Sequence, residues 1–175
     1  RNKFRVRPVG CDLMELLDHR RAEGTDEDPL VVWNHRWAHD KGLDLAVASM
    51  RAIAAQGVGF RLAVVGTDDH HDPARGDKLL APLGERVVHR GWMEPEAYRR
   101  LLCEADVVVA SARQENFGIS VVEAVAAGCV PVVPDALAYP ESIEDPWFRY
   151  PPGRLTTALR DTILGLGEYR RRCAA

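Results

Sequence analysis

Short apolar runs alternate with amphipathic stretches along the chain from residue 30 onward. Runs such as residues 30–33 and 107–110 are apolar at every position, which is typical of strands buried on both faces of a sheet. The stretch 43–56 instead repeats apolar residues at intervals of three and four, which predicts a helix that Gly57 can end. The pattern predicts strands at 30–34, 60–66, 86–90, 106–111 and 130–133, and helices at 43–56, 74–82, 95–104, 118–127 and 154–171.

This alternation predicts an α/β domain: a Rossmann-like parallel sheet with helices on both faces. Ligands of such sheets bind outside the carboxyl ends of the strands, so the polar segments that follow the strands are the candidate site. We expect the domain to span residues 30–175, a C-terminal helix included. Residues 1–29 are interpreted as an interdomain linker, because they end in the turn-rich sequence GTDEDP.

The composition narrows the functional classes. With 175 residues, of which 46% are hydrophobic and 28% charged, the chain fits one globular domain. A net charge of −3 provides no basic field for nucleic acid, so contact with RNA would need a local patch or another domain. No apolar run reaches about 18 residues, and nothing at the N-terminus resembles a signal peptide. Cys103 and Cys129 stand in apolar contexts without C-x-x-C spacing, which predicts buried thiols and a cytoplasmic location.

The segment ENFGISVVE, residues 115–123, follows the predicted strand at 106–111. Gly118 opens the predicted helix, and the free N–H groups and dipole of a helix N-terminus form an anion site. Glu123 lies about 7 Å further along that helix at about 1.5 Å per residue, within reach of a hydroxylated group attached to a bound phosphate. A phosphate near Gly118 and hydroxyls near Glu115 and Glu123 describe a nucleotide-sugar. The alternative is a capped structural helix with one loop acid and one solvated acid.

The segment NHRWAHDKG, residues 34–42, joins the first predicted strand to the first predicted helix. Arg36 offers a planar fork for two phosphate oxygens and Lys41 adds a compact charge, so together they could neutralise a diphosphate without a metal ion. The alternative is a solvated pair of loop cations. His35 and His39 lie near the two cations in the sequence and could donate to a phosphate or sugar oxygen.

These two segments resemble the E-x7-E element and the R-x4-K-G phosphate clamp of the family-four retaining glycosyltransferases, which have the GT-B fold. The resemblance covers nearly the whole chain. It implies that Arg36 and Lys41 stabilise the departing diphosphate, that Glu115 hydrogen-bonds the donor sugar, and that Glu123 binds the ribose hydroxyls. Donor contacts are also implied for the turn between the two glutamates, namely for Asn116, Phe117, Gly118 and Ile119.

Three further residues are candidate donor contacts. Gly66 follows the second apolar run, where it either lets the backbone approach the ligand closely or simply makes a turn. The resemblance implies that Met93 and Glu94 contact the nucleotide base, and the Glu94 carboxylate could accept from guanine N1 and N2, which would suit GDP. Alternatively, Glu94 caps the helix that starts at Pro95. The stretch DDHHD, residues 68–72, is interpreted as a solvated loop, because adjacent residues seldom converge on one metal ion.

The resemblance also implies partners. The segment VRPVGCD, residues 6–12, is similar to the interdomain junction of these enzymes, so we expect a C-terminal half whose acceptor is bound by an N-terminal domain. NHRWAHDKG and AYPE, residues 138–141, resemble the group that includes the tRNA-queuosine α-mannosyltransferases. This implies transfer of mannose from GDP-mannose, with queuosine-modified tRNA as the acceptor. No metal and no cofactor other than the nucleotide-sugar donor is expected.

Other nucleotide-binding classes fit less well. The turn after the first strand lacks the G-x-G-x-x-G of dinucleotide-binding dehydrogenases, and the chain has no G-x-x-x-x-G-K-[ST] loop. The remaining alternative is a non-catalytic nucleotide-sugar-binding or regulatory module. In the favoured interpretation, this fragment binds nucleotide but transfers nothing by itself.

Overall fold

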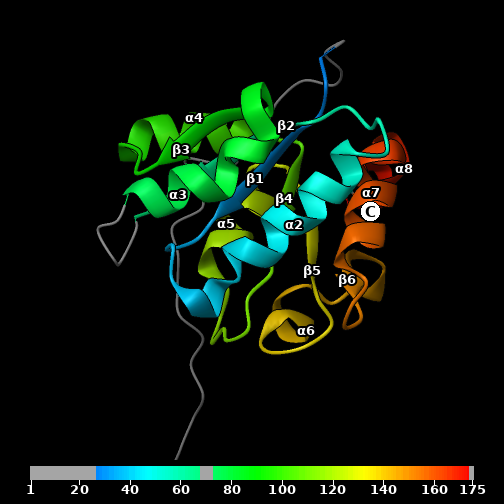
Figure 1. The fold of residues 1–175 in the computed structure, drawn as a ribbon. Helices are drawn as coiled ribbons and strands as arrows, with labels where there is room; N and C mark the ends of the chain where they lie inside the picture. The colour runs from blue at the N-terminus through cyan, green and yellow to red at the C-terminus, as the bar shows by residue number, and fades with distance from the viewer. Residues whose placement is uncertain (1–26, 68–72, 174–175) are drawn as a thin grey trace, which may run out of the picture.

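The computed structural model describes residues 27–67 and 73–173. The strands form one parallel sheet in the order β3-β2-β1-β4-β5-β6 (Figure 1). The chain runs outward from β1 to β3 on one side and from β4 to β6 on the other, so the order reverses between the neighbours β1 and β4. The strands are β1 Leu30–Asn34, β2 Arg61–Val65, β3 Val87–Gly91, β4 Val107–Val109, β5 Val130–Pro134 and β6 Arg149–Tyr150.

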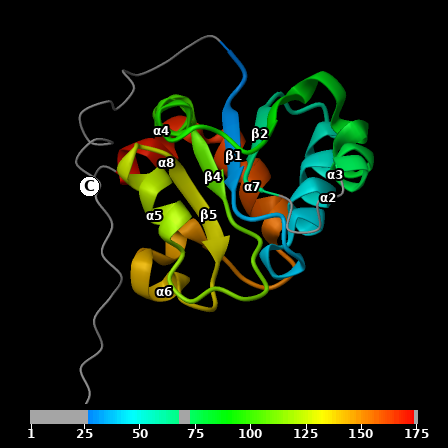
Figure 2. The same cartoon turned by 90° about the vertical axis from the view of Figure 1, so that its left-hand side faces the viewer.

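Helices cover both faces of the sheet. The helices α2, α3 and α7 pack on one face, and α4, α5, α6 and α8 pack on the other; Figure 2 separates the two sets. The helices are α2 Leu43–Ala54, α3 Pro73–Leu80, α4 Pro95–Glu104, α5 Ile119–Ala126, α6 Tyr139–Ser142, α7 Leu155–Leu164 and α8 Leu166–Cys173, with 3-10 turns at η1 His39–Lys41, η2 Ala81–Arg86 and η3 Pro146–Phe148.

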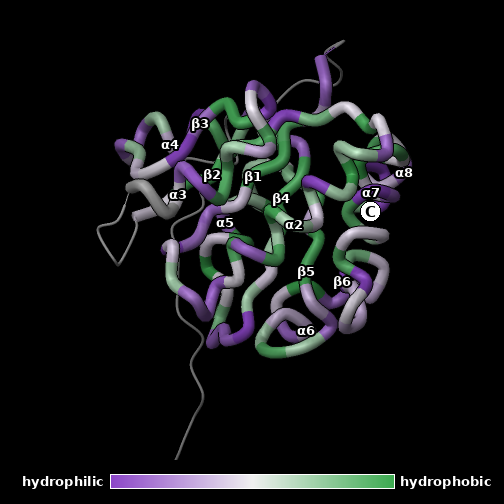
Figure 3. Tube along the Cα trace, viewed as in Figure 1, coloured by the Kyte–Doolittle hydropathy of each residue, from purple (hydrophilic) through white to green (hydrophobic). Residues whose placement is uncertain are grey.

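The core consists of two apolar layers, one on each face of the sheet. Alternation along β1 sends Val31 and Trp33 into the layer beneath α2 and α7, and Leu30 and Val32 into the layer beneath α4 and α5. All five residues of β1 are buried, which explains its continuous apolar run. Figure 3 shows the apolar strands inside the molecule and the more polar segments around them.

The predicted fold class is confirmed, and β1 to β5 begin and end within two residues of the predicted strands. The single helix predicted at 154–171 was wrong, because the chain leaves the helical conformation at Gly165 (φ −101°, ψ 20°), between α7 and α8. The strand β6 was not predicted, since its two residues form no apolar run. Most of the predicted linker, with the junction-like segment 6–12, and the loop 68–72 lie outside the described residues.

A buried carboxylate joins the amino ends of the two central strands. Asp106, directly before β4, is 5% exposed and accepts a 2.6 Å hydrogen bond from the Leu30 N–H of β1. The same carboxylate forms an ion pair with Arg170 of α8. The C-terminal helix is therefore fixed to the centre of the sheet. Of the helices in the described ranges, none has the length and apolar character needed to cross a membrane.

Candidate functional site

The loops that follow β1 and β4 meet at the point where the strand order reverses. Ser111, just after β4, has its hydroxyl 2.8 Å from the carbonyl oxygen of Gly42 and accepts a 3.2 Å hydrogen bond from Trp33 Nε1. The backbone N–H of Arg113 donates to the carbonyl of Asp40 at 2.7 Å. The two segments that carry the predicted site residues thus form a single surface at the carboxyl ends of the strands, where ligands of such sheets bind.

Gly42 makes this close approach possible. Its φ is +67°, a left-handed conformation that glycine adopts without strain. A Cβ atom at this position would lie 2.1 Å from the Ser111 carbonyl oxygen. Any side chain here would therefore separate the two loops.

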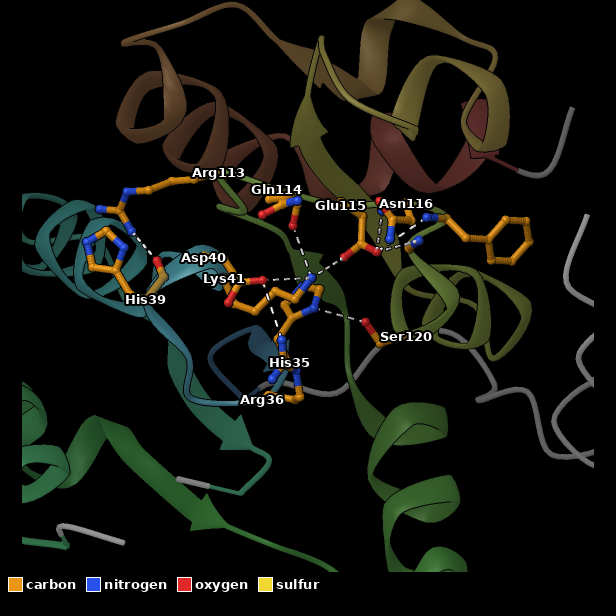
Figure 4. A network of polar contacts seen from close by, with 12 residues as sticks. His35, Arg36, His39, Asp40, Lys41, Arg113, Gln114, Glu115, Asn116 and Ser120 are labelled. Atoms are coloured by element: carbon orange, nitrogen blue, oxygen red, sulfur yellow. Dashed lines mark hydrogen bonds and ion pairs between the residues drawn. The ribbon is translucent and has the colours of Figure 1, made fainter. Parts of the chain in front are cut away.

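Lys41 and Glu115 form an ion pair across the two loops (Figure 4). Lys41 Nζ lies 3.0 Å from Glu115 Oε2 and 3.0 Å from the Gln114 carbonyl oxygen, and both charged side chains are mostly buried, at 14% and 13% exposure. The sequence analysis assigned Lys41 to phosphate and Glu115 to sugar as separate contacts. In the structure, each is the other's partner.

Asp40 is a member of this group that the sequence analysis missed. Its Oδ2 lies 3.5 Å from Lys41 Nζ and 3.5 Å from Arg36 Nη2, while the Arg36 side chain remains 57% exposed. The signal was present in the sequence, because Asp40 adjoins Lys41 and lies four residues after Arg36. With Glu115 included, two cations meet two carboxylates, so the group is formally neutral.

The other oxygen of Glu115 closes the turn before α5. Glu115 Oε1 accepts from the backbone N–H groups of Asn116, Phe117 and Gly118 at 3.1, 3.3 and 3.0 Å (Figure 4). Burial opposes ionisation of Glu115, but the hydrogen bonds from Lys41 and from this turn outweigh it and hold the pKa of the carboxyl below its usual range.

The first turn of α5 still offers two backbone donors. The N–H groups of Ile119 and Ser120 have no hydrogen-bond acceptor within the described part of the chain. Of the backbone donors predicted to meet an anion at this turn, those of Phe117 and Gly118 already bind Glu115, and that of Ile119 keeps no acceptor among the described residues.

His35 lies buried between the ion pair and α5. Its Nδ1 is 3.1 Å from Ser120 Oγ, and its ring packs edge-on against Trp33 at a centroid distance of 5.2 Å. Burial lowers the pKa of His35 to about 4, while the neighbouring charges of Glu115 and Lys41 act in opposite directions. His35 is consequently neutral at pH 7.

Several buried polar atoms at this edge have no hydrogen-bond partner among the described residues: Asn34 Oδ1, His35 Nε2, Trp37 Nε1 and Tyr139 OH. A buried polar atom without a partner costs about 1–3 kcal/mol, so such atoms are uncommon in finished cores. They supply both donors and acceptors, which suits a ligand with several hydroxyl groups.

Tyr139, the first residue of α6, packs beside the turn that precedes α5. The side chain is fully buried, and its Cε1 would lie 3.0 Å from a Cβ atom placed on Gly118. Glu141, in contrast, is exposed. The aromatic ring packs beside Gly118, the residue that precedes α5. Tyr139 therefore supports the turn at which the candidate site lies.

Glu123 lies on α5 and is half-buried. Its Oε2 accepts a 3.0 Å hydrogen bond from the hydroxyl of Tyr98 on α4. The contact between Tyr98 and Glu123 depends on how α4 and α5 pack and could not be deduced from spacing in the sequence.

The remaining predicted donor contacts lie at the ends of β2 and β3. Gly66 has φ +139°, and a Cβ atom there would be 2.0 Å from the His35 carbonyl oxygen, so this glycine allows two loops to approach each other. Met93 is half-buried against the core, and Glu94 is exposed. Glu94 occupies the residue before α4, but its side chain makes no capping hydrogen bond.

Within residues 27–67 and 73–173, no group of three histidine, cysteine or acidic side chains is placed to hold a metal ion. Cys103 and Cys129 are both buried and unpaired, as predicted.

The sequence matches the family described as Glycosyl transferases group 1 over residues 17–151. It is 33% identical over 128 residues to the tRNA-queuosine alpha-mannosyltransferase of Drosophila melanogaster, an alignment that covers 73% of this chain and 34% of that protein. It is 31% identical over 136 residues to the GDP-mannose:cellobiosyl-diphosphopolyprenol alpha-mannosyltransferase of Xanthomonas oryzae, with coverage of 77% and 35%. The chain thus spans about a third of these relatives.

Solved structures share the fold. Sucrose-phosphate synthase from Thermosynechococcus elongatus superposes with a TM-score of 0.67 at 26% identity, over 85% of this chain and 40% of that one. WaaG, a glycosyltransferase involved in lipopolysaccharide biosynthesis, superposes with a TM-score of 0.65 at 23% identity, over 85% and 43%, and this likeness concerns the fold alone.

Proposed function

This chain belongs to the group 1 glycosyltransferases, and on that basis we propose that it is the donor-binding half of a retaining hexosyltransferase. The observation that carries the proposal is the meeting of Lys41 and Glu115 beside the start of α5, where the strand order reverses. A cation, a carboxylate and free backbone N–H groups are then available together for a sugar linked to a diphosphate.

In the proposed reaction, Lys41 and the N–H groups of Ile119 and Ser120 stabilise the charge that develops on the departing diphosphate. Because Asp40 and Glu115 already balance the nearby cations, the phosphates compete with these carboxylates for Lys41. As a phosphate oxygen takes up the Lys41 contact, Glu115 Oε2 is released to accept a hydrogen bond from a sugar hydroxyl. Donor binding and sugar orientation are thereby coupled.

The other predicted contacts complete the donor. Arg36 is exposed enough to turn from Asp40 toward a phosphate oxygen. Glu123 accepts from the ribose hydroxyls, and Met93 and Glu94 meet the base. A carboxylate at Glu94 suits guanine, which offers two donors on one edge.

GDP-mannose is the favoured donor. Two relatives support it by name: the Xanthomonas enzyme described above and a GDP-mannose-dependent alpha-(1-6)-phosphatidylinositol dimannoside mannosyltransferase of Mycobacterium tuberculosis, which is 27% identical over 177 residues. The name of the Drosophila relative supports mannose as the sugar. For the acceptor, the name of the Drosophila relative supports queuosine-modified tRNA. We assign acceptor binding to an N-terminal domain, since the chain carries a net charge of −3 and spans about a third of that relative. The buried, unpaired Cys103 and Cys129 support a cytoplasmic location.

The test is a calorimetric comparison of GDP-mannose, UDP-glucose, UDP-GlcNAc and ADP-glucose on the purified 175-residue chain. We expect GDP-mannose to bind most tightly, and GDP to retain most of the affinity. Absence of binding by all four donors would reject the proposal. Tighter binding of another donor would leave the proposed transferase activity in place but change the assigned sugar and base.

Transfer is tested by adding the N-terminal domain of the complete protein and a queuosine-containing tRNA. Appearance of mannosylated tRNA supports the full proposal. Donor binding without transfer to any offered acceptor favours a non-catalytic nucleotide-sugar-binding module.

A further inference from the structure

A chain of hydrogen bonds runs from the end of β1 to the carboxylate of Glu123. Asn34 Nδ2 lies 2.9 Å from the Tyr98 hydroxyl, and that hydroxyl lies 3.0 Å from Glu123 Oε2. Asn34 Nδ2 also lies 2.7 Å from the carbonyl oxygen of Ser120 in the first turn of α5. Three elements, β1, α4 and α5, therefore meet at one tyrosine side chain.

The direction of this chain is fixed by the chemistry of its members. An amide nitrogen only donates, and Asn34 Nδ2 uses its two protons for the Tyr98 hydroxyl and the Ser120 carbonyl. The Tyr98 hydroxyl accepts from Asn34 and has a single proton, which it donates to Glu123. Burial raises the pKa of Tyr98 above its usual range, and the negative charge of Glu123 acts in the same sense. The phenol is thus protonated at neutral pH and can donate to Glu123.

The hydrogen bond determines how Glu123 presents its carboxylate. The terminal torsion of a glutamate side chain is broad, so a glutamate on a helix surface samples many carboxylate orientations. A donor at Oε2 selects one of them and leaves Oε1 for a ligand. Asn34 is 5% exposed, so the first residue of this series of hydrogen bonds is buried in the core.

We infer that Tyr98 is a positioning residue that holds the Glu123 carboxylate toward the cis-diol of the nucleotide ribose, a role that rests on the proposed function. Tyr98 touches no reacting atom. It acts through Glu123, by removing rotational freedom before the nucleotide arrives, so its effect is confined to ligands that carry both ribose hydroxyls.

The experiment measures dissociation constants of GDP and of its 2′,3′-dideoxy analogue by calorimetry on the full chain, for the wild type and Tyr98→Phe. We expect Tyr98→Phe to weaken GDP binding about tenfold, the loss typical of a hydrogen bond that orients a charged group. The dideoxy analogue has no diol to recognise, so both proteins should bind it within about twofold of each other.

Tyr169→Phe is the matched control. Tyr169 lies on α8 against Trp147 and Phe148, and its hydroxyl makes no hydrogen bond to any residue that the structure describes. This variant loses the same atom elsewhere and should bind both nucleotides as the wild type does.

The same Tyr98→Phe change in a Glu123→Gln protein shows whether Tyr98 positions Glu123 or has a general structural role. In a Glu123→Gln protein, Tyr98→Phe should change GDP affinity by less than about twofold, because the charged group that it positions is gone. Equal losses for GDP and the dideoxy analogue, or an equal loss in the Glu123→Gln background, would overturn the inference while leaving the proposed function intact. Failure of the wild type to bind any nucleoside diphosphate would overturn both.

Discussion

The two ends of the central strands each carry a carboxylate paired with a cation, but their surroundings differ. At the amino ends, Asp106 binds Arg170 and the Leu30 N–H, and nearby buried polar side chains are satisfied. At the carboxyl ends, Glu115 binds Lys41 near buried atoms that have no partner among the described residues, including His35 Nε2 and Tyr139 OH. The first pair completes the fold, whereas the second lies at a surface that keeps unused hydrogen-bond donors and acceptors.

The largest effect is expected at the amino ends. Asp106→Ala should lower the free energy of unfolding by about 4 kcal/mol, because it leaves the Leu30 N–H and the partly buried Arg170 without their acceptor. Urea denaturation measures the loss, and Asp161→Ala, an exposed acid on α7, is the control. In the folded variant, GDP affinity should remain that of the wild type. A parallel loss of affinity would show that the two ends are not separable.

A smaller effect follows from His35, with a folded pKa of about 4 against an ordinary value of 6.5. Between these pH values the unfolded chain binds one more proton than the folded chain, so stability increases with pH. The contribution, about 3 kcal/mol, is complete above pH 6.5 and is lost as the pH falls to 4.

Urea unfolding between pH 4 and 7.5 measures this dependence. His35→Asn, whose amide can replace Nδ1 in the contact with Ser120, should show a flatter profile than the wild type over the same range. Parallel profiles of the two proteins would mean that other groups cause the acid sensitivity.

The smallest change in free energy concerns Lys41. In the complete enzyme, Lys41→Ala should reduce kcat/KM about a hundredfold, since a positioned cation at the developing charge is removed. Its effect on unfolding should be about 2 kcal/mol, less than that of Asp106→Ala, because Glu115 loses one charged partner but keeps its backbone donors.

Steady-state kinetics and urea denaturation together decide this prediction. Lys78→Ala, on the exposed side of α3, serves as the charge-matched control. If Lys41→Ala leaves turnover unchanged, Lys41 has no role in the reaction. The functional difference between the amino and carboxyl ends of the central strands would then be unsupported.

Much of the fold was predictable because buried parallel strands have a distinctive pattern. The run at 30–33 is apolar on both faces because both faces of β1 are covered, and the same holds for β4. The break at Gly165 and the short strand β6 were not predicted. A glycine inside a helical pattern and a two-residue strand leave little trace in the spacing of apolar residues.

The candidate site was predictable only in part. The rule that ligands bind at the carboxyl ends of parallel strands brought Lys41 and Glu115 to one edge. It could not reveal that Glu115 caps its own turn, or that Tyr98 reaches Glu123, because these contacts depend on local turn geometry and on helix packing. The burial of Tyr139 was missed for the same reason, because it depends on how the ring packs beside Gly118.

The pairing of Lys41 with Glu115 joins positions 74 residues apart. The segment between them contains β2, α3, β3 and α4. On the ribosome the site therefore cannot form until the chain has emerged beyond residue 118, so nucleotide cannot assist the folding of the earlier segments. Once Lys41 and Glu115 have met, a donor bound beside them holds the two ends of this segment together. By mass action, a saturating donor then protects β2, α3, β3 and α4 from proteases as one unit.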